Sequence, residues 1–273
     1  MNKKQLIQQI NQKKSYLCVG LDTDISKIPS HLLKYKNPVL EFNKQIIDAT
    51  HDICVAYKPN IAFYEVYGAK GWETLEKTVQ HIPENNFKIA DAKRGDIGNT
   101  SAMYAKTFLE NMAFDAITIA PYMGEDSILP FLSIKNKWVI ILGLTSNKGA
   151  HDFQFLKSKN KPLYQHIIET SMQYGSSSNT MFVVGATKAS SFKTIRSFCP
   201  EHFLLVPGVG AQGGDLQALS EFGMTKDVGL LVNATRSIIY ASTGKDFAEK
   251  ARAEALRLQQ EMKNYLKLYR RKA

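Results

Sequence analysis

The sequence has 273 residues, of which 44% are hydrophobic and 22% are charged, and its formal net charge is +10. It supplies enough apolar residues for one sizeable core, and no linker or low-complexity tract divides it, so we expect a single domain over residues 1–273. The lack of any apolar run of about 18 residues excludes a transmembrane helix, and the polar amphipathic beginning is unlike a signal peptide.

The positive charge raises the question of a nucleic-acid partner. Much of the excess is dispersed or lies near the ends, as in 3–4, 13–14, 157–161 and 263–272. The sequence has no zinc-ligand spacing, RNA-binding aromatic motif or heptad repeat. We therefore expect a solvated basic surface that attracts a small anionic substrate, and neither a nucleic-acid nor a membrane partner.

The three cysteines are Cys18, Cys54 and Cys199, an odd number. Cys18 and Cys54 lie within apolar runs, which indicates buried thiols rather than a disulfide framework. This pattern is typical of a protein in the reducing cytoplasm.

Short apolar or β-branched runs alternate with longer segments of helical period, which is typical of βαβ units. An amphipathic segment at 3–13 comes first. The predicted strands are Tyr16–Leu21, Cys54–Lys58, Phe87–Asp91, Ala116–Ala120, Trp138–Leu144, Met181–Gly185, Phe203–Pro207 and Gly229–Asn233. The predicted helices are 38–52, 64–81, 97–112, 126–134, 163–174, 189–197, 215–222 and 246–269.

The predicted strands are apolar almost throughout, as are strands that helices cover on both faces. Eight such units in one chain predict an α/β protein with a (β/α)8 TIM barrel. An open doubly wound sheet is the alternative, but no Gly-x-Gly-x-x-Gly follows the first strand. We expect the flanking helices at 3–13 and 246–269 to close the bottom and side of the barrel, although either could contact a partner instead.

Polar residues follow nearly every predicted strand. Catalytic residues of this kind of barrel come from the carboxyl ends of the strands, so this pattern predicts an active site there. The strand ends carry Gly20-Leu21-Asp22, Tyr57-Lys58-Pro59-Asn60, Asp91-Ala92-Lys93-Arg94-Gly95-Asp96, Thr145-Ser146-Asn147-Lys148-Gly149, Pro207 to Gly214, and Asn233-Ala234-Thr235-Arg236-Ser237.

Two of these strand ends have residues suited to a phosphate group. The glycines after Pro207 let backbone N–H groups approach an anion, and Gln212 can donate from its amide. The segment 233–236 opens a short helix, and Arg236 is available for a bidentate contact. Phosphate sites after strands seven and eight are frequent in this fold, although the glycines could instead simply form turns.

The sharpest cluster is Asp91-x-Lys93-x-x-Asp96. Residues two apart in a strand share a face, so Asp91 and Lys93 are expected to project together into the mouth, where Lys58 can join them. Alternating charges in a partly dry pocket stabilise one another and create a strong field. A purely structural network of ion pairs is the alternative.

With these residues, the chain resembles the orotidine 5′-phosphate decarboxylases. The closest resemblance is to the bacterial subgroup with the motif Asp-Ala-Lys-Arg-Gly-Asp-Ile-Gly-Asn-Thr, which stands here at 91–100, and it spans about residues 15–240. The resemblance implies a cofactor-free carboxy-lyase that converts orotidine 5′-phosphate (OMP) into UMP and CO2 in de novo pyrimidine biosynthesis. Further matches are Gly20-Leu21-Asp22, Lys58-Pro59-Asn60, Ser146, Pro207-Gly208-Val209-Gly210-Ala211-Gln212 and Asn233-Ala234-Thr235-Arg236.

The resemblance also implies roles for the catalytic cluster. Asp22 and Lys58 would hold the ribose hydroxyls, and Lys58 would order the charges around it. Asp91 would lie against the substrate carboxylate, and Lys93 would be the general acid that protonates C6. Asp96 would complete the catalytic group from the neighbouring subunit.

Other residues are carried over as substrate-binding. Ser146 would hydrogen-bond the pyrimidine, and Gln212 and Arg236 would bind the 5′-phosphate, with Pro207 at the start of the phosphate loop. Thr100, like Asp96, would reach the neighbouring subunit's site, so the resemblance implies a homodimer with shared active sites.

Two features depart from the family pattern. Other branches carry a tyrosine in the phosphate-binding loop, where this chain has Gly213-Gly214, so the residue that replaces it is left open. The loop from Asn147 to Lys161 is also longer than expected, and one interpretation is a lid over the base.

The sequence shows no metal-ligand cluster, dinucleotide fingerprint or pyridoxal-type lysine context, so we expect electrostatics and positioning to lower the barrier without a metal or cofactor. Three alternatives stay open. One is a Mg2+-dependent sugar-phosphate enzyme of the same superfamily, such as a 3-keto-gulonate-phosphate decarboxylase or hexulose-phosphate synthase. The others are a nucleotide-binding barrel without catalysis and a Schiff-base aldolase that uses Lys93 or Lys58.

Overall fold

The computed structural model describes residues 1–185, 189–208 and 215–270. Its centre is a closed barrel of parallel strands in the order β1-β10-β9-β8-β5-β4-β3-β2, which confirms the predicted (β/α)8 barrel. The barrel strands are β1 Leu17–Gly20, β2 Ala56–Lys58, β3 Phe87–Arg94, β4 Ala116–Ile119, β5 Trp138–Leu144, β8 Thr180–Val184, β9 Phe203–Pro207 and β10 Leu230–Ala234.

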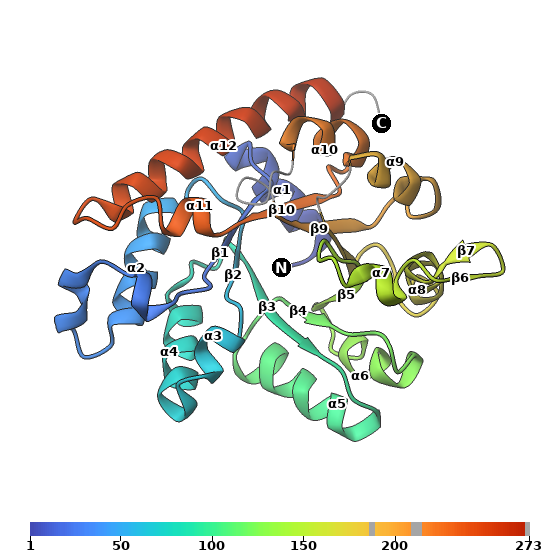
Figure 1. Ribbon diagram of the computed structural model, residues 1–273, viewed down its shortest axis with the longest axis horizontal. Helices are drawn as coiled ribbons and strands as arrows, with labels where there is room; N and C mark the ends of the chain where they lie inside the picture. Colours follow the sequence, from blue (N-terminus) through green and yellow to red (C-terminus); the bar gives the residue numbers. More distant parts are fainter. Residues whose placement is uncertain (186–188, 209–214, 271–273) are drawn as a thin grey trace.

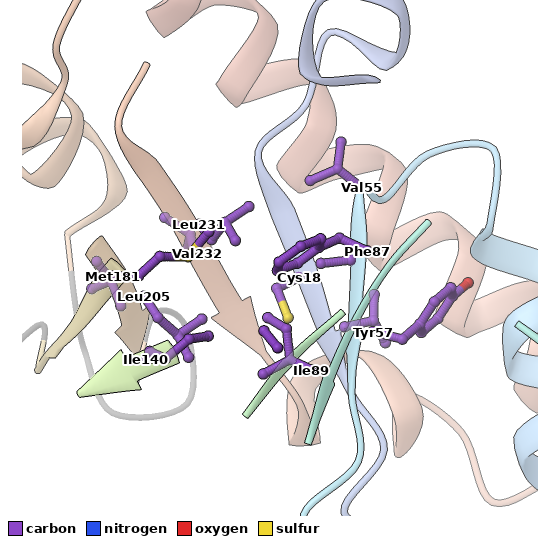
Figure 2. Packing of buried hydrophobic residues seen from close by; sticks show 14 of the residues in the cluster. Cys18, Val55, Tyr57, Phe87, Ile89, Ile140, Met181, Leu205, Leu231 and Val232 are labelled. Atoms are coloured by element: carbon purple, nitrogen blue, oxygen red, sulfur yellow. The ribbon is translucent and has the colours of Figure 1, made fainter. Parts of the chain in front are cut away.

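The strands form where the sequence is apolar on both faces, because each strand contacts the barrel interior on one side and helices on the other. Every residue of β1, β2, β4, β8 and β10 is buried. Figure 2 shows part of this core, with side chains such as Cys18 of β1, Ile89 of β3 and Ile140 of β5. The observed strands agree with the predicted ones to within two residues at most ends, and β3 extends three residues beyond Asp91.

Helices surround the strands, as Figure 1 shows. Most of them match a predicted helix, and the segment predicted at 97–112 is an α-helix that continues as the π-helix η3, Lys106–Asn111. The longer helices are α2 Pro38–Thr50, α4 Gly68–His81, α5 Gly98–Ala105, α8 Leu163–Ser171, α9 Ala189–Phe198 and α10 Leu216–Gly223. The short ones are η1 Ile25–Lys27, η2 Ser30–Lys34, α3 Ala62–Glu65, η4 Glu125–Ser127, α6 Leu129–Leu132 and α11 Arg236–Ile239.

The first and last helices lie beside the barrel. Helix α1, Lys3–Lys13, crosses the amino-terminal end of the strands, where Lys13 Nζ donates to the carbonyl of Cys54 at 3.0 Å, just before β2. Helix α12, Phe247–Tyr269, packs beside it, and Gln259 Nε2 donates to the carbonyl of Lys13 at 2.8 Å. Within the described ranges, no helix has the length and apolar character needed to cross a membrane.

The segment after β5, predicted as one long polar loop, contains small elements of its own. They are α7, Ala150–Phe153, and a hairpin of β6, Lys157–Ser158, with β7, Lys161–Pro162. The Gln154 side chain fastens the segment to the barrel, since it accepts from Thr145 N at 2.8 Å and donates to Thr145 Oγ1 at 2.7 Å. One helical turn and a two-residue ladder are too short to produce a period in the sequence.

Candidate active site

A cavity of about 600 Å³ opens at the carboxyl ends of the strands, which is a typical volume for a small-molecule site. It is lined by polar residues, most of them from the strand ends, and by an apolar wall. The lining residues are Asp22, Lys27, Lys58, Phe63, Asp91, Lys93, Thr118, Leu142, Thr145, Ser146, Asn147, Val183, Leu205, Pro207, Gly208, Asn233, Thr235, Arg236 and Tyr240.

The centre of the cavity is a chain of three charges. Lys58 Nζ at the end of β2 lies 2.6 Å from Asp91 Oδ2, and Lys93 Nζ lies 2.5 Å from Asp91 Oδ1. Lys58 is only 4% exposed, whereas about half of the Lys93 side chain is exposed to the cavity. The inner lysine is therefore held by its surroundings, while the outer ammonium can reach a bound molecule.

The backbone at Lys93 is irregular. The register of β3 against β4 shifts between Ala90 and Arg94, and Lys93 has a φ of 48°, in the left-handed region. The sequence predicted that Asp91 and Lys93 share a face because side chains alternate regularly along a strand. In the structure they meet because the strand is irregular at this point. A left-handed lysine costs of order 1 kcal/mol or more, so the surrounding contacts must hold it in place.

Thr118 on β4 supplies two of these contacts. Its hydroxyl accepts a hydrogen bond from the Lys93 backbone N–H at 3.0 Å and donates one to Asp91 Oδ1 at 3.1 Å. The side chain is 1% exposed, so water does not compete for these bonds. Sequence reasoning missed this residue, although a single hydroxyl within the apolar run Ala116–Ile119 is a usable signal.

Asp22 completes the charge cluster from the end of β1. Its Oδ1 lies 3.7 Å from Lys58 Nζ and, although buried, has no hydrogen-bond partner within the described residues. A buried carboxylate oxygen without a partner is costly, which makes this atom a ready acceptor for a ligand hydroxyl.

The pKa values follow from burial and these neighbours. Burial raises the pKa of Asp22, and the nearby Lys58 only partly opposes this. Burial would raise the pKa of Asp91 too, but Lys58 and Lys93 together hold it well below its usual range. Burial would lower the pKa of Lys58, yet Asp91 and Asp22 keep it above its usual value. Asp91 and Lys58 are thus both charged at neutral pH.

The opposite side of the cavity is less charged. Ser146 lines it after β5, beside the apolar Leu142, Val183 and Leu205. Gly185 allows β8 to end close to this serine, because a Cβ there would lie 2.7 Å from Ser146 N. A polar group within an apolar wall suits a planar heterocycle with few hydrogen-bonding atoms.

The predicted phosphate residues are described only in part. Pro207 and Arg236 line the cavity, and the exposed Arg236 side chain makes no hydrogen bond or ion pair with any described residue. Gln212 lies outside the described residues. Helix α11, which begins at Arg236, is a single turn, so its dipole adds little and the guanidinium is the main positive group.

Asp96 and Thr100 do not line the cavity of their own chain. Asp96 accepts a hydrogen bond from the adjacent Ile97 N–H at 2.7 Å, and Thr100 is exposed on α5. Neither residue therefore meets Lys93 within one subunit. Among the described residues, no group of three His, Cys, Asp or Glu side chains is placed to hold a metal ion.

The chain is similar to known proteins over most of its length. A family model described as orotidine 5′-phosphate decarboxylase / HUMPS family matches residues 15–251. Orotidine 5′-phosphate decarboxylase of Flavobacterium johnsoniae is 60% identical over 265 residues, covering 96% of this chain and 97% of the relative. The enzyme of the same name from Christiangramia forsetii is 58% identical over 269 residues, covering 97% and 99%.

Solved structures agree with this result. The structure of Leishmania donovani OMP decarboxylase matches with a TM-score of 0.83 and 34% identity, over 97% of this chain and 98% of that one. The family predicted from the motif at 91–100 is thereby confirmed. The chain belongs to the orotidine 5′-phosphate decarboxylase / HUMPS family.

Proposed function

We propose that this protein is a carboxy-lyase that converts OMP into UMP and CO2, a step of de novo pyrimidine biosynthesis. The observation that carries the proposal is the Lys58–Asp91–Lys93 chain of charges, with Lys58 and Asp91 buried and Lys93 half-exposed, in a cavity of about 600 Å³. Such a chain holds a negative and a positive group side by side, which decarboxylation with protonation at one carbon requires.

The cavity suggests how OMP binds. Arg236 and Gln212 bind the 5′-phosphate, next to Pro207 at the start of its loop. Asp22 and Lys58 hold the ribose hydroxyls, and the lack of a hydrogen-bond partner at the buried Asp22 Oδ1, in the part of the chain that the structure describes, supports this role. The pyrimidine ring then lies against Ser146 and the apolar wall, and its C6 carboxylate comes close to Asp91.

In the proposed reaction, the C6–carboxylate bond breaks, CO2 leaves, and the electron pair stays on C6. The Lys93 ammonium stabilises this pair and then donates a proton to C6, which gives UMP. Asp91 disfavours the bound carboxylate, because both groups are negative. Lys58 remains charged and keeps Asp91 in place.

The sizes of the energies indicate how much each group lowers the reaction barrier. Two like charges about 4 Å apart at an effective dielectric near 20 repel by about 4 kcal/mol. The most powerful enzymes lower barriers by roughly 20 kcal/mol or more. Repulsion by Asp91 is therefore the smaller share. The larger share comes from preorganised stabilisation of negative charge by Lys93 together with the binding energy of the phosphate group.

The functional unit in this proposal is a homodimer with shared active sites. Asp96 and Thr100 lie outside the cavity of their own chain, and several large apolar side chains are exposed on the same side, on and near α5 and α6. These are Ile97, Met103, Tyr122, Met123 and Leu129, which are 42–92% exposed. A second copy that covers them brings Asp96 and Thr100 to the partner's Lys93.

We also propose that the barrel with its flanking helices is a single catalytic domain and that it works in the cytoplasm. The three cysteines are all free thiols, which supports a reducing compartment.

The test is the loss of OMP ultraviolet absorbance with purified protein in excess EDTA. We expect rapid loss that Lys93→Ala abolishes, with UMP affinity little changed. Lys88→Ala is the matched control, since Lys88 lies on the same strand outside the cavity. No loss of OMP absorbance from folded protein would favour a Mg2+-dependent sugar-phosphate enzyme, and full activity of Lys93→Ala would remove it as the proton donor.

Shared sites have a separate test. Lys93→Ala and Asp96→Ala proteins are each expected to be nearly inactive, but mixing them should restore part of the activity, because one site of a heterodimer is intact. Confirmed heterodimers without any recovery would contradict the shared site.

A further inference from the structure

Lys27 lines the active-site cavity, although neither the sequence patterns nor the family resemblance assigned it a role. It ends η1, the short helix after β1, and lies on the same side of the cavity as Thr235, Arg236 and Tyr240. The ends of β1 and β10 are in direct contact there, because a Cβ on Gly20 would lie 1.9 Å from Thr235 Oγ1.

The position of Lys27 is set by two neighbours. Its Nζ lies 3.2 Å from Asp24 Oδ2 and 5.9 Å from the centre of the Tyr240 ring. A cation over an aromatic face at this distance is attracted to the ring. The ring itself is stacked on Phe42, with 6.1 Å between ring centroids, so it is a fixed support.

Tyr240 also fixes the loop that carries Lys27. Its hydroxyl accepts a hydrogen bond from the Asp24 N–H at 2.8 Å and donates one to the Asp22 carbonyl at 3.2 Å. Burial raises the pKa of Tyr240 to about 12, so the hydroxyl keeps its proton and can make both bonds at neutral pH. Tyr240 thereby ties the β1 loop to the turn that begins at Arg236.

The charged residues of the cavity show which cations can contact an anionic ligand. Its described lining includes the carboxylates Asp22 and Asp91 and the cations Lys27, Lys58, Lys93 and Arg236. Lys58 and Lys93 are paired with Asp91, so the cations beyond this cluster are Lys27 and Arg236. Both lie on the β1–β10 side. A phosphate monoester carries about −1.5 to −2 charges at pH 7, which attracts both Arg236 and Lys27, the latter while it also pairs with Asp24.

We propose that Lys27 is a substrate-binding residue whose ammonium contacts the phosphate group of the bound nucleotide together with Arg236, and that Tyr240 is the residue that positions it. This inference rests on the proposed function, since it takes the ligand to be a nucleoside 5′-monophosphate. Asp24 does not line the cavity and holds the ammonium from outside, so binding of phosphate need not break that pair.

The test compares UMP with uridine, which lacks only the phosphate, by isothermal titration calorimetry. For Lys27→Met we expect UMP affinity to fall about 5- to 20-fold at low salt and uridine affinity to stay the same. Lys34→Met is the matched control, since its ammonium also lies over a tyrosine ring, 5.6 Å from the centre of Tyr35, but outside the cavity.

Tyr240→Phe tests the positioning role, because it keeps the ring and removes both hydrogen bonds. In otherwise unaltered protein, we expect Tyr240→Phe to reduce the preference for UMP over uridine. In the Lys27→Met background, we expect Tyr240→Phe to cause no further reduction of this preference. A purely structural role would weaken UMP and uridine binding equally in both backgrounds.

The outcomes separate this inference from the proposed function. Equal losses for UMP and uridine in Lys27→Met, or unchanged UMP affinity, overturn the phosphate contact even if OMP is turned over normally. A selective loss for UMP in a protein that does not turn over OMP keeps the contact and refutes the decarboxylase. No binding of UMP by the unaltered protein overturns both.

Discussion

Replacing the buried lysine of the charge cluster, Lys58→Met, removes a cation and leaves two carboxylates in nearly the same space. Lys58 is 4% exposed and lies 2.6 Å from Asp91 and 3.7 Å from Asp22. Breaking a buried ion pair by removing one partner typically costs about 3–5 kcal/mol, because the other charge is left uncompensated. For a chain of this length that corresponds to a fall in Tm of roughly 6–10 °C.

The pH dependence is the sharper part of this prediction. In the unaltered protein the pKa of Asp91 is lowered, so its stabilisation is present above the unfolded value near 4 and is lost only in stronger acid. Without Lys58, the pKa values of Asp91 and Asp22 both rise. A carboxylate with a raised folded pKa destabilises the fold as pH increases through that value, so the deficit of the variant must shrink on acidification. It should shrink by about 1.4 kcal/mol for each unit of this pKa rise that lies between the two pH values compared.

The assay is urea unfolding at pH 7.5 and pH 4.5, followed by circular dichroism. The protein concentration is held fixed, because the stability of the proposed dimer would depend on it. Lys77→Met is the control, since Lys77 is half-exposed and pairs with Glu73 one helical turn away. It should be indistinguishable from the unaltered protein. A Lys58→Met deficit that is equal at both pH values, or below about 1 kcal/mol, would refute the uncompensated-charge argument.

Two further substitutions test contacts of the site. Thr118→Val removes the hydrogen bonds to Asp91 and to the Lys93 backbone. Because a hydrogen bond to a charged group contributes about 1.5–3 kcal/mol, kcat should fall roughly 10- to 100-fold. Thr118→Ser should restore most of it in steady-state assays, and a Thr118→Val enzyme with normal kcat would show that the bonds do not matter. Gly20→Ala places a methyl group against Thr235 and should cost about 1–3 kcal/mol in urea unfolding. Thr235→Ala in the same chain should recover part of that loss, and additive losses would contradict the contact.

The barrel could be predicted from the sequence because its strands are buried on both faces and so are apolar throughout. Asp22, Lys58, Asp91 and Arg236 could be located for the same reason, since polar residues at the ends of such runs stand out. Their convergence on one cavity follows from the parallel strands, whose carboxyl ends all lie at one end of the barrel.

Other parts of the site leave no such pattern. Thr118 lies within a strand rather than at its end, and its role depends on the register of β4 against a broken β3. Lys27 and Tyr240 are more than 200 residues apart and meet only because β1 and β10 close the barrel. A sequence motif contains residues that are neighbours in the chain, whereas closure of the barrel brings together residues from the two ends of the chain.

The left-handed backbone at Lys93 has a consequence for how this protein can evolve. Glycine or asparagine would adopt that conformation at lower cost, so selection for folding alone favours replacing the lysine. Selection for turnover favours keeping it if it is the proton donor. A library screened only for thermal stability should therefore become enriched in inactive variants at this position, and the most stable sequence for this barrel should differ from the most active one.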